Sequence, residues 1–139
     1  MTAAAPETRS TIGHPLAAEQ VRILHVYSGN LYGGLETFLR ALAVHRASTS
    51  ATMDFALCFE GRIATELRDA GAKVHILGEV RVRSPRSVGA ARRALAETLT
   101  AGRYDVVVCH SSWPYALFAP VVRAAGAQLV FYMHDVLAR

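Results

Sequence analysis

Apolar positions along the chain fall into two alternating patterns. Short continuous runs rich in valine, isoleucine and aromatic residues are typical of strands that are buried on both faces of a sheet. These runs predict five strands, at 21–27, 53–59, 73–77, 105–109 and 128–133.

The segments between the runs have helical periodicity. The clearest stripe predicts a helix directly after Gly33-Gly34, with apolar residues at i, i+3, i+4, i+7 and i+8: Leu35, Phe38, Leu39, Leu42 and Ala43. Three further helices are predicted: 62–70, ended by a left-handed cap at Gly71; a helix after Ser84-Pro85, closed by Gly102; and a helix capped by Ser111 or Ser112, with Pro114 in its first turn, that runs to about 125.

Strands that alternate with helices, without a hairpin signal, predict right-handed βαβ units. The fold class is therefore α/β, a doubly wound, Rossmann-like parallel sheet of at least five strands. The common strand order 3-2-1-4-5 would place the topological switch between strands one and four, where ligands bind at the carboxyl ends of the strands. Three loops would meet there: 28–34, 110–113 and 134–135.

Length and composition suit one domain. The chain has 139 residues, of which 52% are hydrophobic and 19% charged, which excludes a disordered or fibrous protein. No apolar run approaches the roughly 18 residues that span a bilayer. Residues 1–20 are polar and alanine-rich and predict a flexible N-terminal extension rather than a signal peptide. A cytoplasmic protein is expected.

The net charge of +4 permits an anionic partner without naming one. Five arginines crowd around the third predicted helix: Arg81, Arg83, Arg86, Arg92 and Arg93. A solvated helix face is the simpler interpretation of this cluster. The alternative is contact with an anionic acceptor or an acidic membrane surface. Nucleic acid is not expected, because no aromatic residues are interleaved with these arginines.

Cysteines and most histidines have ordinary structural explanations. Cys58 and Cys109 lie in apolar runs without ligand spacing, so buried free thiols are favoured over a disulfide. His25 and His75 lie within strands and are interpreted as satisfied core or sheet-face histidines. Asp105 is interpreted as a strand-opening residue that faces solvent. No metal site is predicted, since no histidine and carboxylate pair has helical ligand spacing.

The segment 28–36 contains the strongest candidate chemistry. Gly33 and Gly34, at a strand-to-helix turn, would let backbone amides approach an anion, and the helix N-terminus favours phosphate. The alternative is a simple tight turn, with Glu36 complementing the helix dipole. The dinucleotide and P-loop fingerprints are both missing, and Glu60 near the end of the second strand does not replace them. Ser111 and Ser112 do not form a nucleophile elbow.

Three stretches resemble the N-terminal, acceptor-side domain of the family 4 retaining glycosyltransferases, which have the GT-B fold. They are ILHVYSGNLYGGLETFLRALA at 23–43, YDVVVCHSSW at 104–113 and LVFYMHD at 129–135. The resemblance covers residues 21–139. It implies a hexosyltransferase-type enzyme that moves a sugar from a nucleotide-sugar donor to a glycan, lipid or small-molecule acceptor. The nucleotide sugar would be a co-substrate, and no cofactor is implied.

The resemblance also implies residue roles. Gly33 and Gly34 would match the loop that lies against the donor diphosphate. His134 would match the histidine that contacts the donor sugar near the reaction centre, although a strand-end histidine bonded to backbone is the alternative. Asp135 beside it invites a general-base role. The acceptor cleft would be lined by Tyr32, His110, Ser111 and Trp113, with packing under the fourth helix as the alternative for Trp113.

The sequence departs from the family by lacking the C-terminal domain that binds the nucleotide sugar. The first hypothesis is therefore a truncated glycosyltransferase, inactive alone, that needs a complementing C-terminal domain or self-associates through uncovered apolar surface. The second is a stand-alone, flavodoxin-like module that binds a phosphate-bearing ligand or a protein without catalysis.

Overall fold

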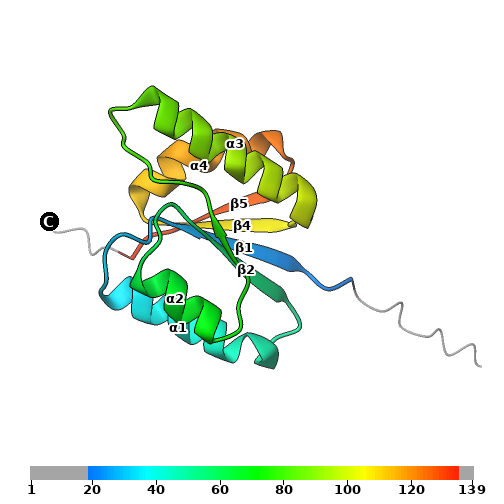
Figure 1. Cartoon of the computed structure of the whole chain (residues 1–139). Coiled ribbons are helices and arrows are strands. Elements are labelled where there is room, and N and C mark those ends of the chain that lie inside the picture. Colours follow the sequence, from blue (N-terminus) through cyan, green and yellow to red (C-terminus); the bar gives the residue numbers. More distant parts are fainter. Residues whose placement is uncertain (1–18, 135–139) are drawn as a thin grey trace, which may run out of the picture.

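The computed structural model describes residues 19–134. The predictions for residues 1–18 and for Asp135 lie outside this range. Within it the chain forms one parallel sheet with strand order β3-β2-β1-β4-β5 (Figure 1). The predicted fold class and strand order are both confirmed. The strands are β1 (Arg22–Tyr27), β2 (Thr52–Leu57), β3 (Val74–Ile76), β4 (Val106–His110) and β5 (Gln128–Tyr132).

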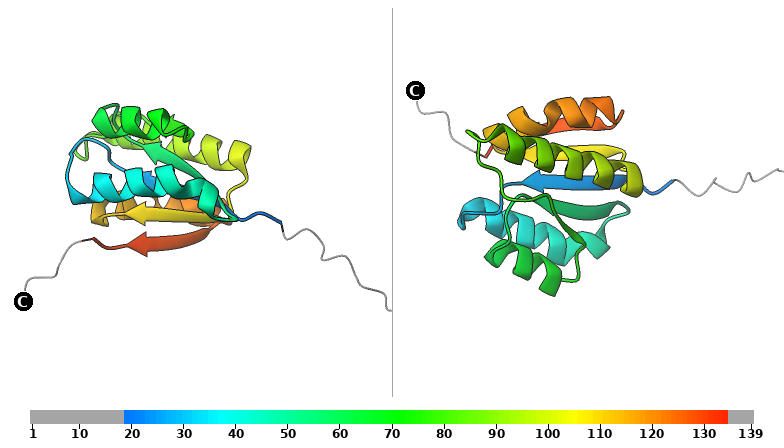
Figure 2. Two further views of the ribbon diagram at one scale, coloured as in Figure 1. Left: turned by 90° about the horizontal axis from the view of Figure 1, so that it is seen from below. Right: turned by 45° about the horizontal axis from the view of Figure 1, so that its top comes forward.

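Two helices cover each face of the sheet, as the views in Figures 1 and 2 agree. Helices α1 (Gly34–His45) and α2 (Arg62–Asp69) pack on one face, and α3 (Pro85–Gly102) and α4 (Ser112–Ala124) pack on the other. A 3₁₀ turn at Arg46–Ser48, which the periodicity does not predict, follows α1. The predicted element bounds otherwise differ from the observed ones by one or two residues.

Strand alternation divides the core into two clusters. Leu24 and Val26 of β1 point into the larger cluster beneath α3 and α4, whereas Tyr27 joins the smaller cluster beneath α1 and α2. Cys58 and Cys109 both lie in the larger cluster as free, fully buried thiols, as predicted. Burial raises the pKa of both thiols to about 12, so they remain protonated and unreactive at neutral pH.

Glycines lie at the ends of both α2 and α3, as predicted, but for different physical reasons. Gly71 has φ +80°, the left-handed conformation that glycine adopts without strain. After α3 the left-handed residue is Arg103, with φ 49°, and not Gly102. A side chain at Gly102 would collide with the ring of Tyr104. Gly102 is therefore required for close packing rather than for its backbone conformation.

The amino edge of the sheet is held by a polar network. The Tyr104 hydroxyl donates to Asp54 at 2.6 Å, and His75 Nε2 lies 3.2 Å from the same hydroxyl. Asp105 is exposed and accepts a hydrogen bond from the Arg22 amide at 2.8 Å. The expected structural roles of His75 and Asp105 are confirmed.

Strand β5 lies at the outer edge of the sheet (Figure 2). Its apolar side chains are unusually accessible: Phe131 is 36% exposed, Tyr132 43%, and the following Met133 46%. Phe131 packs only partly, against the ring of Tyr115 at a centroid distance of 4.7 Å. No helix within residues 19–134 is long and apolar enough to cross a membrane.

Candidate functional site

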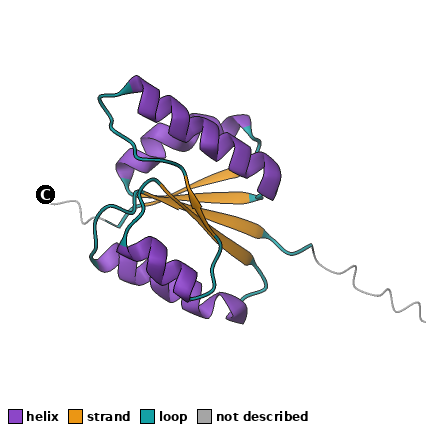
Figure 3. Cartoon of the chain, in the orientation of Figure 1, coloured by secondary structure: helices purple, strands orange, loops and turns teal. Residues whose placement is uncertain are grey.

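The loops after β1, β4 and β5 open on the same edge of the sheet, as predicted (Figure 3). The connection from β1 leads to α1 on one face, and the connection from β4 leads to α4 on the other. The two strands are neighbours, so the topological switch lies between them. The predicted candidate residues gather along this carboxyl edge.

The turn after β1 depends on Gly29 and not on Gly33 or Gly34. Gly29 has φ +84°, and a Cβ there would lie 3.0 Å from the Phe59 carbonyl oxygen. Gly33 has an extended backbone, with φ −173°, and a Cβ at Gly34 would have no neighbour within 4 Å. Neither glycine of the pair is thus explained by a tight turn. Their effect is to leave the backbone at the start of α1 uncovered.

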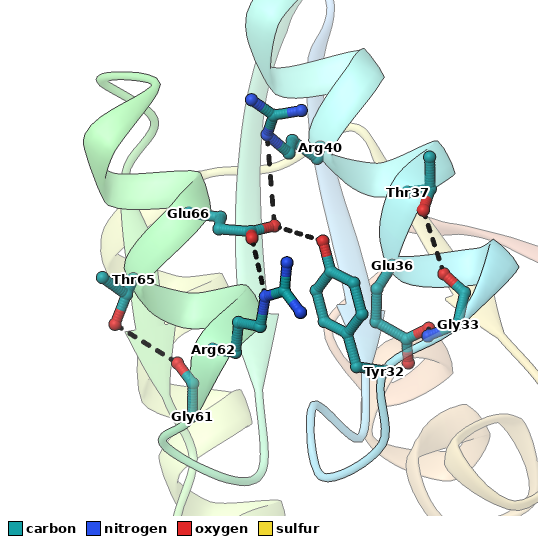
Figure 4. A network of polar contacts seen from close by, with 9 residues as sticks. All are labelled: Tyr32, Gly33, Glu36, Thr37, Arg40, Gly61, Arg62, Thr65 and Glu66. Atoms are coloured by element: carbon teal, nitrogen blue, oxygen red, sulfur yellow. Dashed lines mark hydrogen bonds and ion pairs between the residues drawn. The ribbon is translucent and has the colours of Figure 1, made fainter.

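A buried carboxylate holds this loop against α1. Glu36 is 2% exposed; its Oε2 accepts from the Gly33 amide at 2.6 Å, and its Oε1 accepts from the Tyr27 hydroxyl at 2.6 Å. Figure 4 shows Glu36 beside Gly33. The placement complements the helix dipole, as the alternative interpretation expects. It leaves the amides of Gly34 and Leu35, which lie in the first turn and have no helical carbonyl to bond, as the donors available to an anion.

Tyr32 ties the same loop to α2. Its hydroxyl donates to Glu66 at 2.6 Å, which raises the pKa of Tyr32 and lowers that of Glu66. The Arg62 guanidinium lies 3.9 Å from the Tyr32 ring centroid and donates to Glu66 at 2.9 Å (Figure 4). Tyr32 keeps 41% of its surface exposed and lines a pocket of about 230 Å³ with Gly29, Phe59 and neighbouring residues.

Three histidines form a continuous chain across β1, β4 and β5. His25 Nδ1 lies 2.9 Å from His110 Nε2, and His110 Nδ1 lies 2.8 Å from His134 Nε2. The rings of His25 and His110 stack at a centroid distance of 5.2 Å. The chain runs from the interior of the sheet to its carboxyl edge, where Phe38 of α1 packs against His134 at 5.3 Å.

Burial keeps the inner two rings neutral. His25 is 7% exposed and His110 is 0% exposed. Desolvation lowers the pKa of His25 to about 4 and that of His110 to about 3, the latter also through its two histidine neighbours. At neutral pH each of these rings therefore carries one proton, so one nitrogen donates and the other accepts.

The structure corrects two expectations about histidines. His110 was expected to line the acceptor cleft, but it is fully buried and reaches His134 instead of the surface. His25 was expected to be a satisfied core or sheet-face histidine. Its Nε2 is buried and has no hydrogen-bond partner among the described residues.

Register explains why sequence reasoning missed His25 as a site residue. His25 pairs with Val108, two residues before His110, and His110 pairs with Tyr132, two residues before His134. Residues two apart in a strand share a face, so the three histidines form a diagonal, one strand and two residues per step. The sequence contains this signal, but only once strand order and register are known.

The remaining acceptor-cleft candidates differ in their environments. Ser111 has φ 70°, an unusual conformation for a residue with a side chain, and its hydroxyl makes no capping bond to α4. Pro114 lies in the first turn of α4, as predicted. Trp113 is partly buried against the core cluster beneath α3 and α4, which matches the packing alternative.

Glu60 and the arginine cluster lie apart from the histidine chain. Glu60 forms a bidentate pair with Arg68, at 2.7 and 2.9 Å, so its carboxylate stabilises α2 locally. The five clustered arginines have no acidic partner among the described residues. Arg92 donates to the Leu117 carbonyl at 2.8 Å, and Arg92 and Arg93 line a groove of about 530 Å³ between α3 and α4.

Comparison with protein families identifies the family to which the chain belongs. Residues 33–139, more than three quarters of the chain, match the glycosyl transferase 4-like domain. The chain belongs to this family. The match begins at Gly33, the first of the two uncovered glycines, and it includes His110 and His134 but not His25.

Solved structures show the same fold. The glycosyl transferase 4-like domain superposes on a glycosyltransferase from Rickettsia africae ESF-5 with a TM-score of 0.73 and 17% identity, covering 87% of this chain and 31% of that one. MurG from Acinetobacter baumannii gives 0.67 and 15%, covering 86% and 36%. HepE from Anabaena, solved with UDP and glucose, gives 0.64 and 19%, covering 86% and 31%.

The chain spans about a third of the length of these solved structures. Comparison with curated proteins finds no significant match. Among residues 19–134, no group of three or more histidine, cysteine or acidic side chains has the geometry of a metal site.

Proposed function

We propose that the glycosyl transferase 4-like domain forms the acceptor-side wall of a nucleotide-sugar-dependent glycosyltransferase with the GT-B architecture. The observation that carries the proposal is the meeting, at one sheet edge, of the uncovered start of α1 with the outer end of the histidine chain. A donor diphosphate would lie against the Gly33-Gly34 loop, where the amides of Gly34 and Leu35 are available, and the donor sugar would lie at His134. HepE, which has the same fold, was solved with UDP and glucose.

Physical chemistry supports these two assignments. The N-terminus of α1 presents unpaired amides and the positive end of the helix dipole, both of which favour a phosphate. His134 is hydrogen-bonded to His110, which burial keeps neutral, and an imidazole at this position can form a hydrogen bond to a sugar hydroxyl. Tyr32 and Ser111 lie on the loops of this edge and would contact the acceptor. Trp113 lies in the first turn of α4 and would contribute only the part of its ring that is not packed against the core, while His110 would support His134 from behind.

Isolated residues 1–139 are expected to lack turnover. In the enzymes that this chain resembles, a C-terminal domain holds the nucleoside, and rate acceleration depends on contacts that strengthen in a transition state held between two domains. One wall of the cleft provides only part of them. Full activity would need a complementing C-terminal domain. The nucleotide sugar acts as a co-substrate, and the mechanism requires no cofactor.

A panel of UDP-, GDP- and ADP-sugars tests this function. Ligand-observed NMR is expected to detect one donor class binding in the millimolar range, about −4 kcal/mol, with competition by inorganic diphosphate. Transfer and hydrolysis should remain at background. Robust turnover would contradict the proposed inactivity. Failure of every nucleotide sugar, combined with binding of another phosphate-bearing ligand, would favour the stand-alone binding module.

The arginine cluster around α3 is proposed as a peripheral membrane contact. Arg81, Arg83 and Arg86 are exposed at the start of α3, near the carboxyl edge, and form no ion pair with a carboxylate of residues 19–134. Anionic headgroups attract such residues by about 1 kcal/mol each near the surface. Cosedimentation with phosphatidylglycerol vesicles, but not with phosphatidylcholine vesicles, is expected. Equal binding to both would contradict the contact.

A further inference from the structure

The chain of histidines has a consequence for the proton on His134. Each nitrogen-to-nitrogen bond needs one donor and one acceptor, and His110 is neutral and carries a single proton. If that proton is on Nδ1, His110 donates to His134 Nε2 and accepts from His25 Nδ1. If it is on Nε2, both bonds reverse. Either way the three rings share one tautomer, because the proton position of one ring dictates that of the next.

The buried end of the chain distinguishes the two directions. His25 Nε2 has no partner among the described residues, and its ring stacks on Phe55 at an interplanar angle of 22°, so this nitrogen does not point at the ring face. If the hydrogen bonds donate outward, from His25 towards His134, His25 Nε2 is an acceptor without a donor. If they donate inward, from His134 towards His25, His25 Nε2 carries an N–H without an acceptor. Buried N–H groups without an acceptor are the rarer defect in proteins. The hydrogen bonds between the three histidines should therefore donate outward, from His25 towards the sheet edge.

We propose that His25 and His110 are positioning residues that hold His134 in its Nδ1–H form, with Nε2 accepting from His110, so that Nδ1 of His134 acts as a hydrogen-bond donor. That this donor faces a sugar hydroxyl or a phosphate oxygen rests on the proposed function. The tautomer itself does not. An uncoupled imidazole favours the Nε2–H form, so the Nδ1–H form at His134 is a specific signature of the chain.

Burial and ring packing hold the three histidine side chains in place. His110 lies between the stacked His25 ring and the ring of Tyr132 at 5.7 Å, while Phe38 covers it from α1 at 6.2 Å. His134 lies 4.3 Å from the Tyr132 ring centroid. These contacts exclude water from His110, which is 0% exposed, so water does not compete for its two ring nitrogens.

Long-range ¹H–¹⁵N correlation spectra of the wild-type chain at neutral pH test the proposal directly, because they report which nitrogen of each imidazole carries the proton. The Nδ1–H form is expected at His25, His110 and His134. The Nε2–H form at His134, or different tautomers at His110 and His134, would overturn the proposal. The measurement uses no donor or acceptor.

Substitution of His25, two rings away, tests the coupling. His25→Phe keeps an aromatic ring against Phe55 and removes the donor to His110, and it is expected to shift the tautomer ratio of His134 about fivefold towards Nε2–H, the size of one hydrogen bond. His25→Asn, whose amide can donate from the position of Nδ1, should restore the wild-type ratio. His45→Asn, at an exposed histidine at the end of α1, is the matched control and should change nothing. An unchanged ratio in folded His25→Phe would overturn the positioning role.

A parallel binding titration separates this inference from the proposed function. If nucleotide sugars fail to bind but the tautomers are as expected, the function is wrong and the positioning stands. If a nucleotide sugar binds at the carboxyl edge but His134 is in the Nε2–H form, the positioning is wrong and the function stands.

Discussion

Buried histidines are the residues with the largest expected effect on the pH dependence of stability. The unfolded chain titrates its histidines near pH 6.5, whereas the folded pKa of His25 is about 4 and that of His110 about 3. Between these values the unfolded state takes up protons that the folded state refuses. The contribution of these two histidines to the free energy of unfolding is therefore complete above about pH 6.5 and decreases as the pH drops towards 4.

Urea unfolding of the wild type and of His25→Phe between pH 7 and pH 4 measures this dependence. Removal of one such group is expected to make the decline shallower by up to about 1.4 kcal/mol per pH unit. Parallel pH profiles for the two proteins would show that His25 takes up no extra proton on unfolding.

Glu36 is the second residue whose burial predicts a measurable effect. Glu36→Gln keeps one oxygen to accept from the Gly33 amide, but its amide nitrogen can only donate, so the Tyr27 hydroxyl must reverse its bond and the charged acceptor of both groups is lost. Stability is expected to fall by about 1–3 kcal/mol in urea unfolding. Tyr27→Phe, which removes one donor and leaves the carboxylate in place, should cost less. A Glu36→Gln protein as stable as the wild type would contradict this account.

Individual site residues were only partly predictable from the sequence. Gly33 and Gly34 were candidates because a glycine pair precedes a helical stripe, and His134 because it follows a strand; their ligand roles come from the family resemblance and stay predictions. The burial of His110 and the participation of His25 depend on register between strands that are about 80 residues apart. Local patterns contain no register, so both were misjudged.

At the scale of elements, two substitutions near the start of α1 distinguish a glycine needed for stability, Gly29, from one proposed to serve ligand binding, Gly34. Gly34→Ala places a methyl group in open space at the first helical position, so stability should be unchanged or rise by up to about 1 kcal/mol. The same methyl group covers the first-turn amides, so binding of nucleotide sugars should weaken severalfold. Thermal unfolding and ligand-observed NMR measure the two effects.

Gly29→Ala is the contrasting variant on the same loop. Its positive φ and its 3.0 Å contact with the Phe59 carbonyl oxygen predict a loss of about 1–3 kcal/mol in stability. If Gly34→Ala binds nucleotide sugars as tightly as the wild type, the phosphate site is not at this helix start.

Strands and helices themselves were largely predictable. Parallel strands buried on both faces are continuous apolar runs, and the helices have clear stripes, so all nine predicted elements appear within residues 19–134. The physical reason for an end was less predictable where tertiary packing decides it. Gly102 closes α3 as expected, but a glycine is needed there because the ring of Tyr104 packs against it.

For the whole molecule, the exposed β5 edge predicts self-association. The run from Leu129 to Met133 has no charged residue, and an apolar, unpaired edge strand invites pairing with another chain. Sedimentation velocity is expected to show association that increases with concentration. Met133→Lys, which places a charge beside the edge, should reduce it.

Val44→Lys is the matched control for this edge. Val44 is 50% exposed on α1, so the substitution adds the same charge to a similarly accessible site away from β5. A wild-type chain that stays monomeric at every concentration, or a Val44→Lys effect equal to that of Met133→Lys, would contradict association through β5.

The central claim is that the carboxyl edge of this glycosyl transferase 4-like domain faces a nucleotide sugar. The most direct test is a ¹H–¹⁵N titration of the labelled chain with the nucleotide sugar of the panel that binds best. The account predicts that amide shifts concentrate at residues 29–36 and 110–112 and at His134. Shifts confined to the α3–α4 groove lined by Arg92 and Arg93, or to the amino edge around Asp54 and Tyr104, would contradict it.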